Sequence, residues 1–420
     1  MPYKRLINYY AEMPELNAVS VIPLITSITD LDDPESIQES YFNTAVKLQQ
    51  MNLQNEILKL LHVLWLEGSA FGYVYDDDSS FFIHVLDGKY CKISSLDRGV
   101  PRFAFDFTYF DSAPADLENW APEFKKKYNA YLKDSQGMRW QELEHNCQIC
   151  LKLDMDDPLL SLPPFLPIFE LLISLIDLQG IQDVKNELQI IKILVARLET
   201  FDNGEPDDWK VNLDLATEYY NLLAESLPPQ VAAVISPLPI EPVEFKANDT
   251  KEENDIATAT NTLFKTSGGS SVLGSDKSGS SIFKAQIISD VNFGVKTVLG
   301  QIQRWVNVYL DDILGEDHAL VKFIETTAYT VADKKKSLLE SGNNGVPFKL
   351  AVGALDGYSP LELLSLDYLE NKVLKLHESW IPFSTSYTQS GKGTQGAPEK
   401  AESELTDEGA DTRDEEKNKM

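Results

Sequence analysis

The stretch that decides the fold is residues 282–313, IFKAQIISDVNFGVKTVLGQIQRWVNVYLDDI. Its apolar side chains recur every three or four residues, as they do on the buried face of an α-helix. They are Ile287, Ile288, Val291, Val295, Val298, Leu299, Ile302, Trp305, Val306 and Tyr309. At ~1.5 Å per residue such a helix spans roughly 45 Å. The pattern predicts one long amphipathic helix that forms a structural wall.

A Gly/Ser-rich loop precedes this helix and follows a polar one. Residues 267–281 hold seven serines and four glycines in fifteen positions, so the loop has almost nothing with which to bury itself. The residues before it, 248–265, have a helical pattern. The order helix, loop, long helix suits a wall with a flexible element that projects into a cavity or channel.

Composition and charge exclude several classes of protein. The chain has 420 residues, 43% of them hydrophobic, and 37 basic against 66 acidic side chains for a net charge of −29. A conventional DNA-binding protein would be basic, and an acidic body would let a polyanion slide past without holding it. The absence of a long uncharged apolar run predicts no membrane span and no secretory signal. Without either, we expect a protein kept in the cytosol. Three cysteines, an odd number, argue against a disulfide framework.

Periodicity and turn residues divide the rest of the chain into helices and strands. We expect an antiparallel sheet over 72–110, with alternation at Phe103, Phe105, Phe107 and Tyr109, and disorder from about Ser384 onward. The expected helices are 44–66 (capped by Asn43), 116–133, 165–198 (with a soft spot at Gly180), 207–227, 331–340, 346–354 and 360–376 (capped by Ser359, with Pro360 at the first helical position). Further strands are expected at 139–153, as a closing pair, at 231–245, interrupted by Pro237, Pro239 and Pro242, and at 319–329.

None of the polar clusters predicts a catalytic or metal site. His145, Cys147 and Cys150 (HNCQIC) suggest zinc, but a structural zinc site needs four ligands and no second pair follows. Two acidic runs could bind a cation, but they are more simply a hairpin turn and a polar, helix-capping loop. The Gly/Ser loop lacks the spacing of a phosphate-binding loop, and no nucleophile is paired with any of the histidines. The acidic runs are Asp76, Asp77 and Asp78, and Asp30, Asp32, Asp33 and Glu35; the histidines are His62, His84, His318 and His377.

Four stretches, spread over nearly the whole chain, resemble the portal protein of tailed bacteriophages, in particular of long-tailed phages of Gram-positive bacteria. They carry no catalytic fingerprint, so their order is what makes the resemblance. The stretches are WLEGSAFGYVYDDD (65–78) with VLDGKYCKI and FAFDFTYFD, VISPLPIEPVEFKAND with TATNTLFKTSGGSS, the helix ending in QIQRWVNVYL, and GALDGYSPLELLSLDYLENKVLKL with the acidic tail LTDEGADTRDEEKN.

The resemblance implies an α+β, portal-type subunit with an α/β wing, long stem helices, a small α/β clip and a helical crown. The chain is short for the family, so a reduced or largely absent crown is expected. The implied regions are a wing at 1–164, the first stem helix at 165–200, the clip at 201–246, the second stem helix at 247–266, a tunnel loop at 267–281, a long kinked helix at 282–315, a wing return with crown helices at 316–383 and a disordered acidic tail at 384–420.

The resemblance also implies particular roles for residues of the loop and the long helix. Lys265 and Lys277 are candidates for transient contacts with DNA phosphates, with solvated surface lysines as the alternative. Gly294 and Gly300 are candidate bend points of the helix. The candidates for lining a DNA channel are Ser267, Gly268, Gly269, Ser270, Ser271, Gly274, Lys277 and Gly279.

The function that the resemblance implies is mechanical and not enzymatic. Twelve subunits would form a ring at one capsid vertex of the virion, through which double-stranded DNA is packaged, retained and ejected. The implied partners are the terminase large subunit, a head-completion adaptor, and the major capsid and scaffolding proteins, with no cofactor and no membrane. The expected subunit contacts are the apolar start of the first stem helix and the proline-interrupted strands. An intracellular scaffold or adaptor oligomer is the alternative, and a hydrolase stays open from size alone.

Overall fold

The computed structural model describes twelve segments of the chain, which divide into two compact units, Met1–Leu363 and Leu364–Met420. Most of the described residues, and both hydrophobic cores, belong to the first unit. No described helix is long and apolar enough to cross a bilayer. The described residues are 2–25, 33–77, 80–112, 114–154, 161–190, 192–199, 201, 208–227, 231–236, 249–267, 280–315 and 318–376.

Three helices form the N-terminal part: α1 (Pro2–Ala11), α2 (Pro34–Met51) and α3 (Leu53–Glu67). The single helix predicted at 44–66 was wrong in its start, because α2 begins a full ten residues earlier. Asp33, and not Asn43, is the cap, since its carboxylate accepts the Ser36 N–H at 3.1 Å. Asn52 takes a left-handed conformation (φ 44°) and separates α2 from α3.

Residues 69–152 form two antiparallel three-stranded sheets. Their strand orders are β3-β2-β7 and β4-β5-β6. An antiparallel sheet and a closing pair of strands at 139–153 were predicted here, and both strands are present; they do not pair with each other but close one sheet each, β6 beside β5 and β7 beside β2. The strands are β2 (Ser69–Asp76), β3 (Phe81–Leu86), β4 (Cys91–Asp97), β5 (Val100–Asp106), β6 (Trp140–Glu142) and β7 (Gln148–Lys152).

The aromatic alternation at 103–109 does not mark a strand with one wet face. β5 is buried on both faces, and the chain turns into a 3-10 helix, Phe107–Asp111, before Tyr109 is reached. The rings pack with helix α4 (Pro122–Lys133) into an aromatic core. The alternation therefore reflects burial between two layers.

A separate, two-stranded sheet joins distant parts of the chain. β1 (Val19–Ile22) pairs in an antiparallel register with β10 (Leu320–Phe323), from Val19↔Phe323 to Ile22↔Leu320. β10 was predicted as part of 319–329, whereas β1 was missed within a segment that has a helical pattern overall. Strands of four residues carry too little periodicity to be recognised alone.

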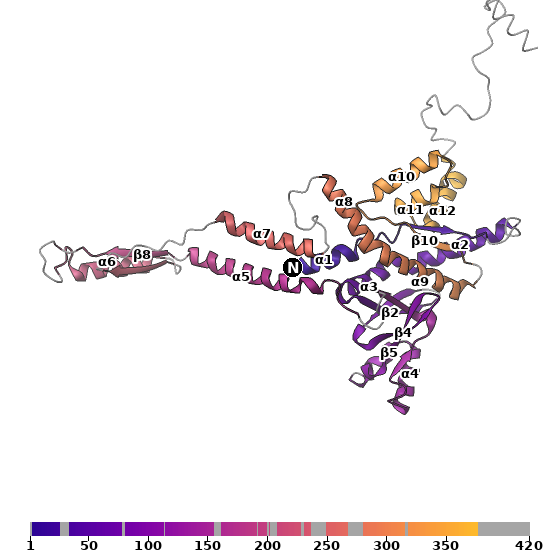
Figure 1. Cartoon of the computed structure of the whole chain (residues 1–420), viewed down its shortest axis with the longest axis horizontal. Helices are drawn as coiled ribbons and strands as arrows, with labels where there is room; N and C mark the ends of the chain where they lie inside the picture. Colours follow the sequence, from indigo (N-terminus) through magenta and orange to yellow (C-terminus); the bar gives the residue numbers. More distant parts are fainter. Residues whose placement is uncertain are drawn as a thin grey trace, which may run out of the picture. The chain divides into compact units, whose positions relative to one another are not determined.

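Helices α5 (Phe169–Ile190) and α7 (Asp249–Thr266) lie side by side (Figure 1). α5 runs through Gly180 without a break. The helix predicted to about Leu198 is too long, because Lys192–Arg197 is a strand, β8, in parallel register with β9 (Val231–Ser236). Helix α6 (Leu213–Ser226) connects the two strands in a βαβ unit. Pro237, Pro239 and Pro242 lie outside the described residues.

The long helix is present but is not uniform. α8 (Ser280–Val291) passes into a π-helical turn, Asn292–Lys296, and then into α9 (Thr297–Leu314). The predicted apolar stripe is buried along α9, including Val298, Ile302, Trp305 and Tyr309, but the prediction was wrong at Ile288 in α8, which is 58% exposed. This stripe belongs to the larger core, which also takes in α1, α3 and β10.

Three helices follow the sheet strand β10: α10 (Val331–Asn343), α11 (Lys349–Leu355) and α12 (Pro360–Tyr368), which ends in a π-helical turn, Leu369–Val373. The predicted cap of α12 is confirmed. The Glu362 N–H donates to Ser359 Oγ at 3.2 Å, and the Ser359 N–H donates to Glu362 Oε2 at 2.8 Å, which is a complete capping box. The predicted tail from Ser384 lies outside the described residues.

The two fully buried tryptophans of the main core, Trp65 and Trp305, differ in the hydrogen bonding of the indole N–H. Trp305 Nε1 donates to the Gln148 carbonyl at 2.8 Å, whereas Trp65 Nε1 has no hydrogen-bond partner among the described residues. Trp305→Phe should therefore cost more unfolding free energy than Trp65→Phe, by about 1–3 kcal/mol, because it orphans a buried carbonyl. Urea unfolding of the two variants measures the difference, and equal losses would contradict it.

Candidate functional site

The first end of the Gly/Ser loop is fixed by helix α7. Leu263 and Phe264, in its last turn, are buried in the main core. Ser267 continues the helical hydrogen bonding, since its N–H donates to Leu263 O at 3.0 Å and its Oγ to Phe264 O at 2.8 Å. Lys265 is exposed and has no ion pair among the described residues. Gly268, Gly269, Ser270, Ser271, Gly274, Lys277 and Gly279 lie outside the described residues.

Helix α8, which follows the loop, is anchored in its last turns. Ile287 and Asp290 are buried there, and Asp290 is only 1% exposed. Its carboxylate accepts a hydrogen bond from Tyr9 Oη at 2.8 Å. A buried carboxylate requires such a partner, since removing it from water is costly. Helix α1 therefore holds the loop-bearing helix where the π-helical turn begins.

The two candidate bend points occupy different environments. Gly294 lies in the π-helical turn, and a Cβ on it would come within 2.9 Å of the Tyr10 ring. Gly300 lies in regular helix, with nothing within 4 Å of its Cβ position. π-Helical turns are among the common causes of helix bends. Close packing against α1 gives Gly294 a role that Gly300 does not have.

Helix α9 is bonded to strand β7 by two side chains one turn apart. Gln301 Nε2 donates to Lys152 O at 2.7 Å, and its Oε1 accepts the Lys152 N–H at 3.0 Å. Trp305 supplies the indole hydrogen bond to Gln148 O. These two side chains therefore supply hydrogen-bond partners to backbone groups at both ends of β7, as a neighbouring strand would.

The opposite side of α9 is bonded to strand β10 in the same way. Asn307 donates to Val321 O and accepts the Val321 N–H, both at 2.8 Å, and Gln303 Oε1 accepts the Phe323 N–H at 3.0 Å. One edge of β10 pairs with β1, so α9 satisfies the other edge. Sequence reasoning missed Gln301, Gln303 and Asn307, although uncharged amides beside an apolar helical stripe are a usable signal of buried backbone partners.

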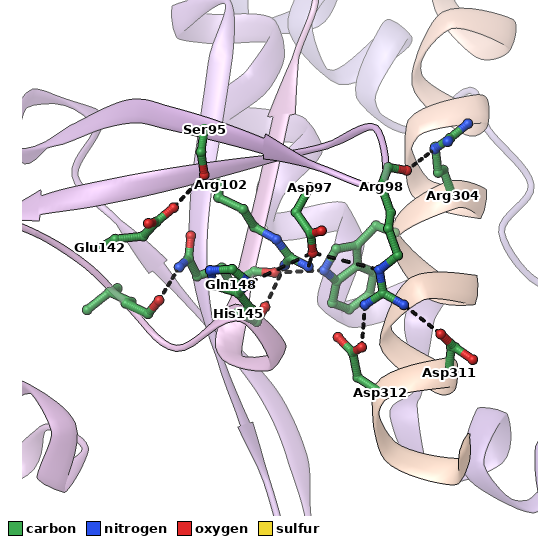
Figure 2. A network of polar contacts seen from close by, with 12 residues as sticks. Ser95, Asp97, Arg98, Arg102, Glu142, His145, Gln148, Arg304, Asp311 and Asp312 are labelled. Atoms are coloured by element: carbon green, nitrogen blue, oxygen red, sulfur yellow. Dashed lines mark hydrogen bonds and ion pairs between the residues drawn. The ribbon is translucent and has the colours of Figure 1, made fainter. Parts of the chain in front are cut away.

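The tip of the β4–β5 hairpin also clamps α9 (Figure 2). Its two turn residues have positive φ, 49° at Arg98 and 77° at Gly99, which is the backbone of a tight type I′ turn. The Arg98 guanidinium donates to Asp311 Oδ2 at 2.5 Å and also to Asp312, and Arg304 Nε donates to the Arg98 carbonyl at 2.6 Å. Glycine is favoured at 99 by its positive φ, and a Cβ there would also press against the Arg304 side chain.

A buried arginine supports the hairpin from behind. Arg102 is 1% exposed and donates to Asp97 Oδ2 at 3.1 Å and to the His145 carbonyl at 2.5 Å. The hydrogen bond from Arg102 is the largest of the influences that lower the pKa of Asp97 below its usual range. The two arginines thus tie the hairpin, the turn at His145 and α9 into one network (Figure 2).

A shallow groove of about 460 Å³ lies along the outer face of α9 beside this hairpin. Residues one turn apart, Gly300, Arg304 and Val308, line it together with Arg98 and His318. Nothing in its lining pairs a nucleophile with a base. Gln303 and Asn307, which also line it, are already bonded to β10.

Several described members of the polar clusters that were weighed as ligand sites have structural partners, while Asp30, Asp32 and Asp78 lie outside the described residues. Asp76 is a strand residue, not a solvated turn, and it binds Lys47 Nζ at 2.6 Å and the Tyr309 hydroxyl. Asp77 is the turn residue, since its carboxylate accepts the Ser80 N–H at 2.7 Å. Burial raises the pKa of the Cys150 thiol to about 12, so it is neutral at ordinary pH. The described residues bring no three metal-ligating side chains together.

The different settings of the two glycines lead to opposite effects on stability. Gly300→Ala should stabilise the protein by about 0.5–1 kcal/mol, because alanine favours the helix and the site is open. Gly294→Ala should destabilise it, because the buried Tyr10 ring is stacked on both Trp65 and Phe165 and cannot move freely. Thermal unfolding of both variants measures this, and a shift of the same sign in both would contradict it.

The lowered pKa of Asp97 predicts a pH-dependent contribution to stability. A carboxylate with a depressed folded-state pKa stabilises the protein above its unfolded pKa of about 3.9, and the contribution disappears as the pH falls through the folded value. Asp97→Asn should therefore lower the unfolding temperature at pH 7 and have much less effect at pH 3. An equal loss at both pH values would argue against the Arg102 hydrogen bond as the cause.

Comparison with known proteins gives distant similarity only. No family model and no curated protein matches the chain. Among solved structures it is similar to a chain in the virion of a native gene transfer agent (GTA) particle, with 13% identity and a TM-score of 0.42, over 84% of this chain and 88% of that one. It is also similar to a chain in the neck of an empty GTA particle computed with C6 symmetry, with 13% identity, a TM-score of 0.43 and the same coverage. Similarity this low carries no conclusion about function.

Proposed function

We propose that the chain is a portal subunit, which forms a ring at one vertex of a phage-type capsid. The observation that carries the proposal is the placing of the Gly/Ser-rich segment 268–279. It lies between α7, whose last turn is buried in the main core, and α8, whose Ile287 and Asp290 are buried further along the helix. A compositionally flexible segment between two anchored helices suits a loop presented to a channel.

The acidic charge supports a channel more than a binding surface. At a net charge of −29, the chain repels the phosphates of DNA except where single lysines, such as the exposed Lys265, interrupt the acidic surface. Double-stranded DNA would pass such a wall without being held by it. In this role the protein is not an enzyme. Its ring would serve the packaging motor (terminase large subunit), a head-completion adaptor, and the capsid and scaffolding proteins of the virion.

Helix α5 supplies a surface for ring formation. A stripe of its apolar side chains faces solvent in the single chain, and Ile173 and Ile176 are 60% and 61% exposed. Apolar side chains at this spacing on one helix are buried in most stable proteins, so another copy is the simplest cover. The stripe comprises Phe169, Ile173, Ile176 and Val184, and Leu166 in the 3-10 turn before α5 extends it.

Images of the purified full-length protein test the proposal. We expect a monodisperse annulus with a central hole in negative stain and a mass of many subunits in solution. Compact particles of low mass would overturn the portal function and favour a scaffold or adaptor instead.

The α5 surface leads to a prediction of its own. Ile176→Glu should lower the ring fraction, raising the concentration needed for assembly at least about tenfold (~1.4 kcal/mol), because a charge would be buried between copies. Gln179→Glu places the same side chain at an exposed polar position on α5 and should leave assembly intact. Mass photometry over a concentration series distinguishes the two, and rings that survive Ile176→Glu unchanged would exclude this face.

A further inference from the structure

Helix α4 carries an uncompensated positive surface in an acidic chain. Residues 120–140 hold five basic and two acidic side chains. Lys125, Lys126 and Lys133 are exposed on α4, and none of them has an ion pair among the described residues. Lys127, on the same helix, does pair, with Glu123 at 3.2 Å. Lys126 and Lys133 are seven residues apart and so share one face of α4, and Lys125 is exposed beside them.

Apolar and aromatic side chains lie among these lysines. Leu132 is 61% exposed and Met138 44% exposed. Trp140 is half-buried with Lys92 Nζ over its ring at 4.3 Å. Gln141 Nε2 donates to both Met138 O and Lys127 O, which holds this strand start against the helix. We call Lys125, Lys126, Leu132, Lys133, Met138 and Trp140 the α4 patch.

The mixture favours a protein partner over nucleic acid. Methionine and aromatic residues surrounded by a charged rim are typical of protein interfaces. A surface that follows phosphates depends on cations alone, with affinity set by the number of phosphates neutralised. If the α4 patch bound a nucleic-acid backbone, Leu132 and Met138 would remain exposed to water.

The first turns of α2 have the complementary chemistry. Residues 30–39 hold five acidic side chains and no basic one. Glu35, Glu39 and Phe42 recur at i, i+4 and i+7 and are all exposed, Phe42 by 49%. Asp33, also exposed, precedes them as the helix cap. We call Asp33, Glu35, Glu39 and Phe42 the α2 patch.

We propose that the α4 patch of one copy binds the α2 patch of the next copy. A cyclic ring needs two different, complementary faces on each subunit, and these two patches match in both charge and apolar content. Copies with a net charge of −29 also repel one another, and an attractive contact between unlike charges would offset that repulsion during assembly. The inference rests on the proposed ring, and it adds a contact distinct from the α5 stripe.

A charge swap in the full-length protein tests the contact. Lys125→Glu/Lys126→Glu should lower the ring fraction in mass photometry at low salt, raising the concentration needed for assembly about tenfold or more. Glu35→Lys/Glu39→Lys should do the same. The four changes in one chain should restore the rings, because the two patches then attract again with reversed signs. Added salt should reduce all these differences.

A matched control comes from the second run of lysines in the chain. Lys334→Glu/Lys336→Glu makes the same change in net charge at exposed positions of α10 and should leave the rings intact. Circular dichroism of every variant checks that the fold is kept.

Each other outcome overturns the contact. If charge reversal at Lys125 and Lys126 disrupts the rings and the variant with all four substitutions does not restore them, the partner of the α4 patch is an acidic surface other than the α2 patch. If rings are unchanged but binding to a 30-base-pair duplex is lost, the patch binds DNA. If no variant affects assembly, the patches are not an interface. If the wild-type protein forms no ring, the proposed function fails first, which the unmodified protein shows by itself.

Discussion

The hydrogen bonds between the side chains of α9 and the backbones of β7 and β10 are the interaction on which the rest of the first unit depends. Gln301 and Trp305 serve β7 on one side of the helix, and Gln303 and Asn307 serve β10 on the other. Each such bond adds about 1 kcal/mol net, but a buried backbone group left without its partner costs about 1–3 kcal/mol. The helix therefore cannot slide or rotate without exposing several unsatisfied groups at once.

This anchorage separates a rigid part of the long helix from a part that carries the loop. α9 is held by both sheets and by the Arg98 hairpin, whereas α8 lies beyond the π-helical turn and is held at Asp290 by Tyr9. The exposed ion pairs of the hairpin add less than their number suggests, because solvent screens them. The hydrogen bonds to the strand backbones, which are buried or partly buried, define where α9 lies, and the ion pairs hold the hairpin against it.

The residues that were predicted well are those whose role is local. Ser359 and Glu362 form a capping box within four residues, and the apolar stripe of α9 follows from helical periodicity alone. The wrong predictions involve partners far apart in the chain. The segment KILVAR reads equally well as the end of a helix, and only its pairing with β9, about forty residues later, makes it a strand. Asp76 was predicted to be a turn residue, because its partners Lys47 and Tyr309 come from distant parts of the chain.

The sequence alone determined the mixed helix and strand content, the long helix with its buried stripe, the Gly/Ser composition of the segment before it and the acidic charge. These properties depend on composition and on spacing along one element. The tertiary structure alone decided which strands pair, which glycine packs against α1, and which polar side chains of α9 bond the backbones of β7 and β10. The physical reason is that hydrogen bonding and burial depend on distance in space, and an amide bonded to a strand and a solvated one are written with the same letter.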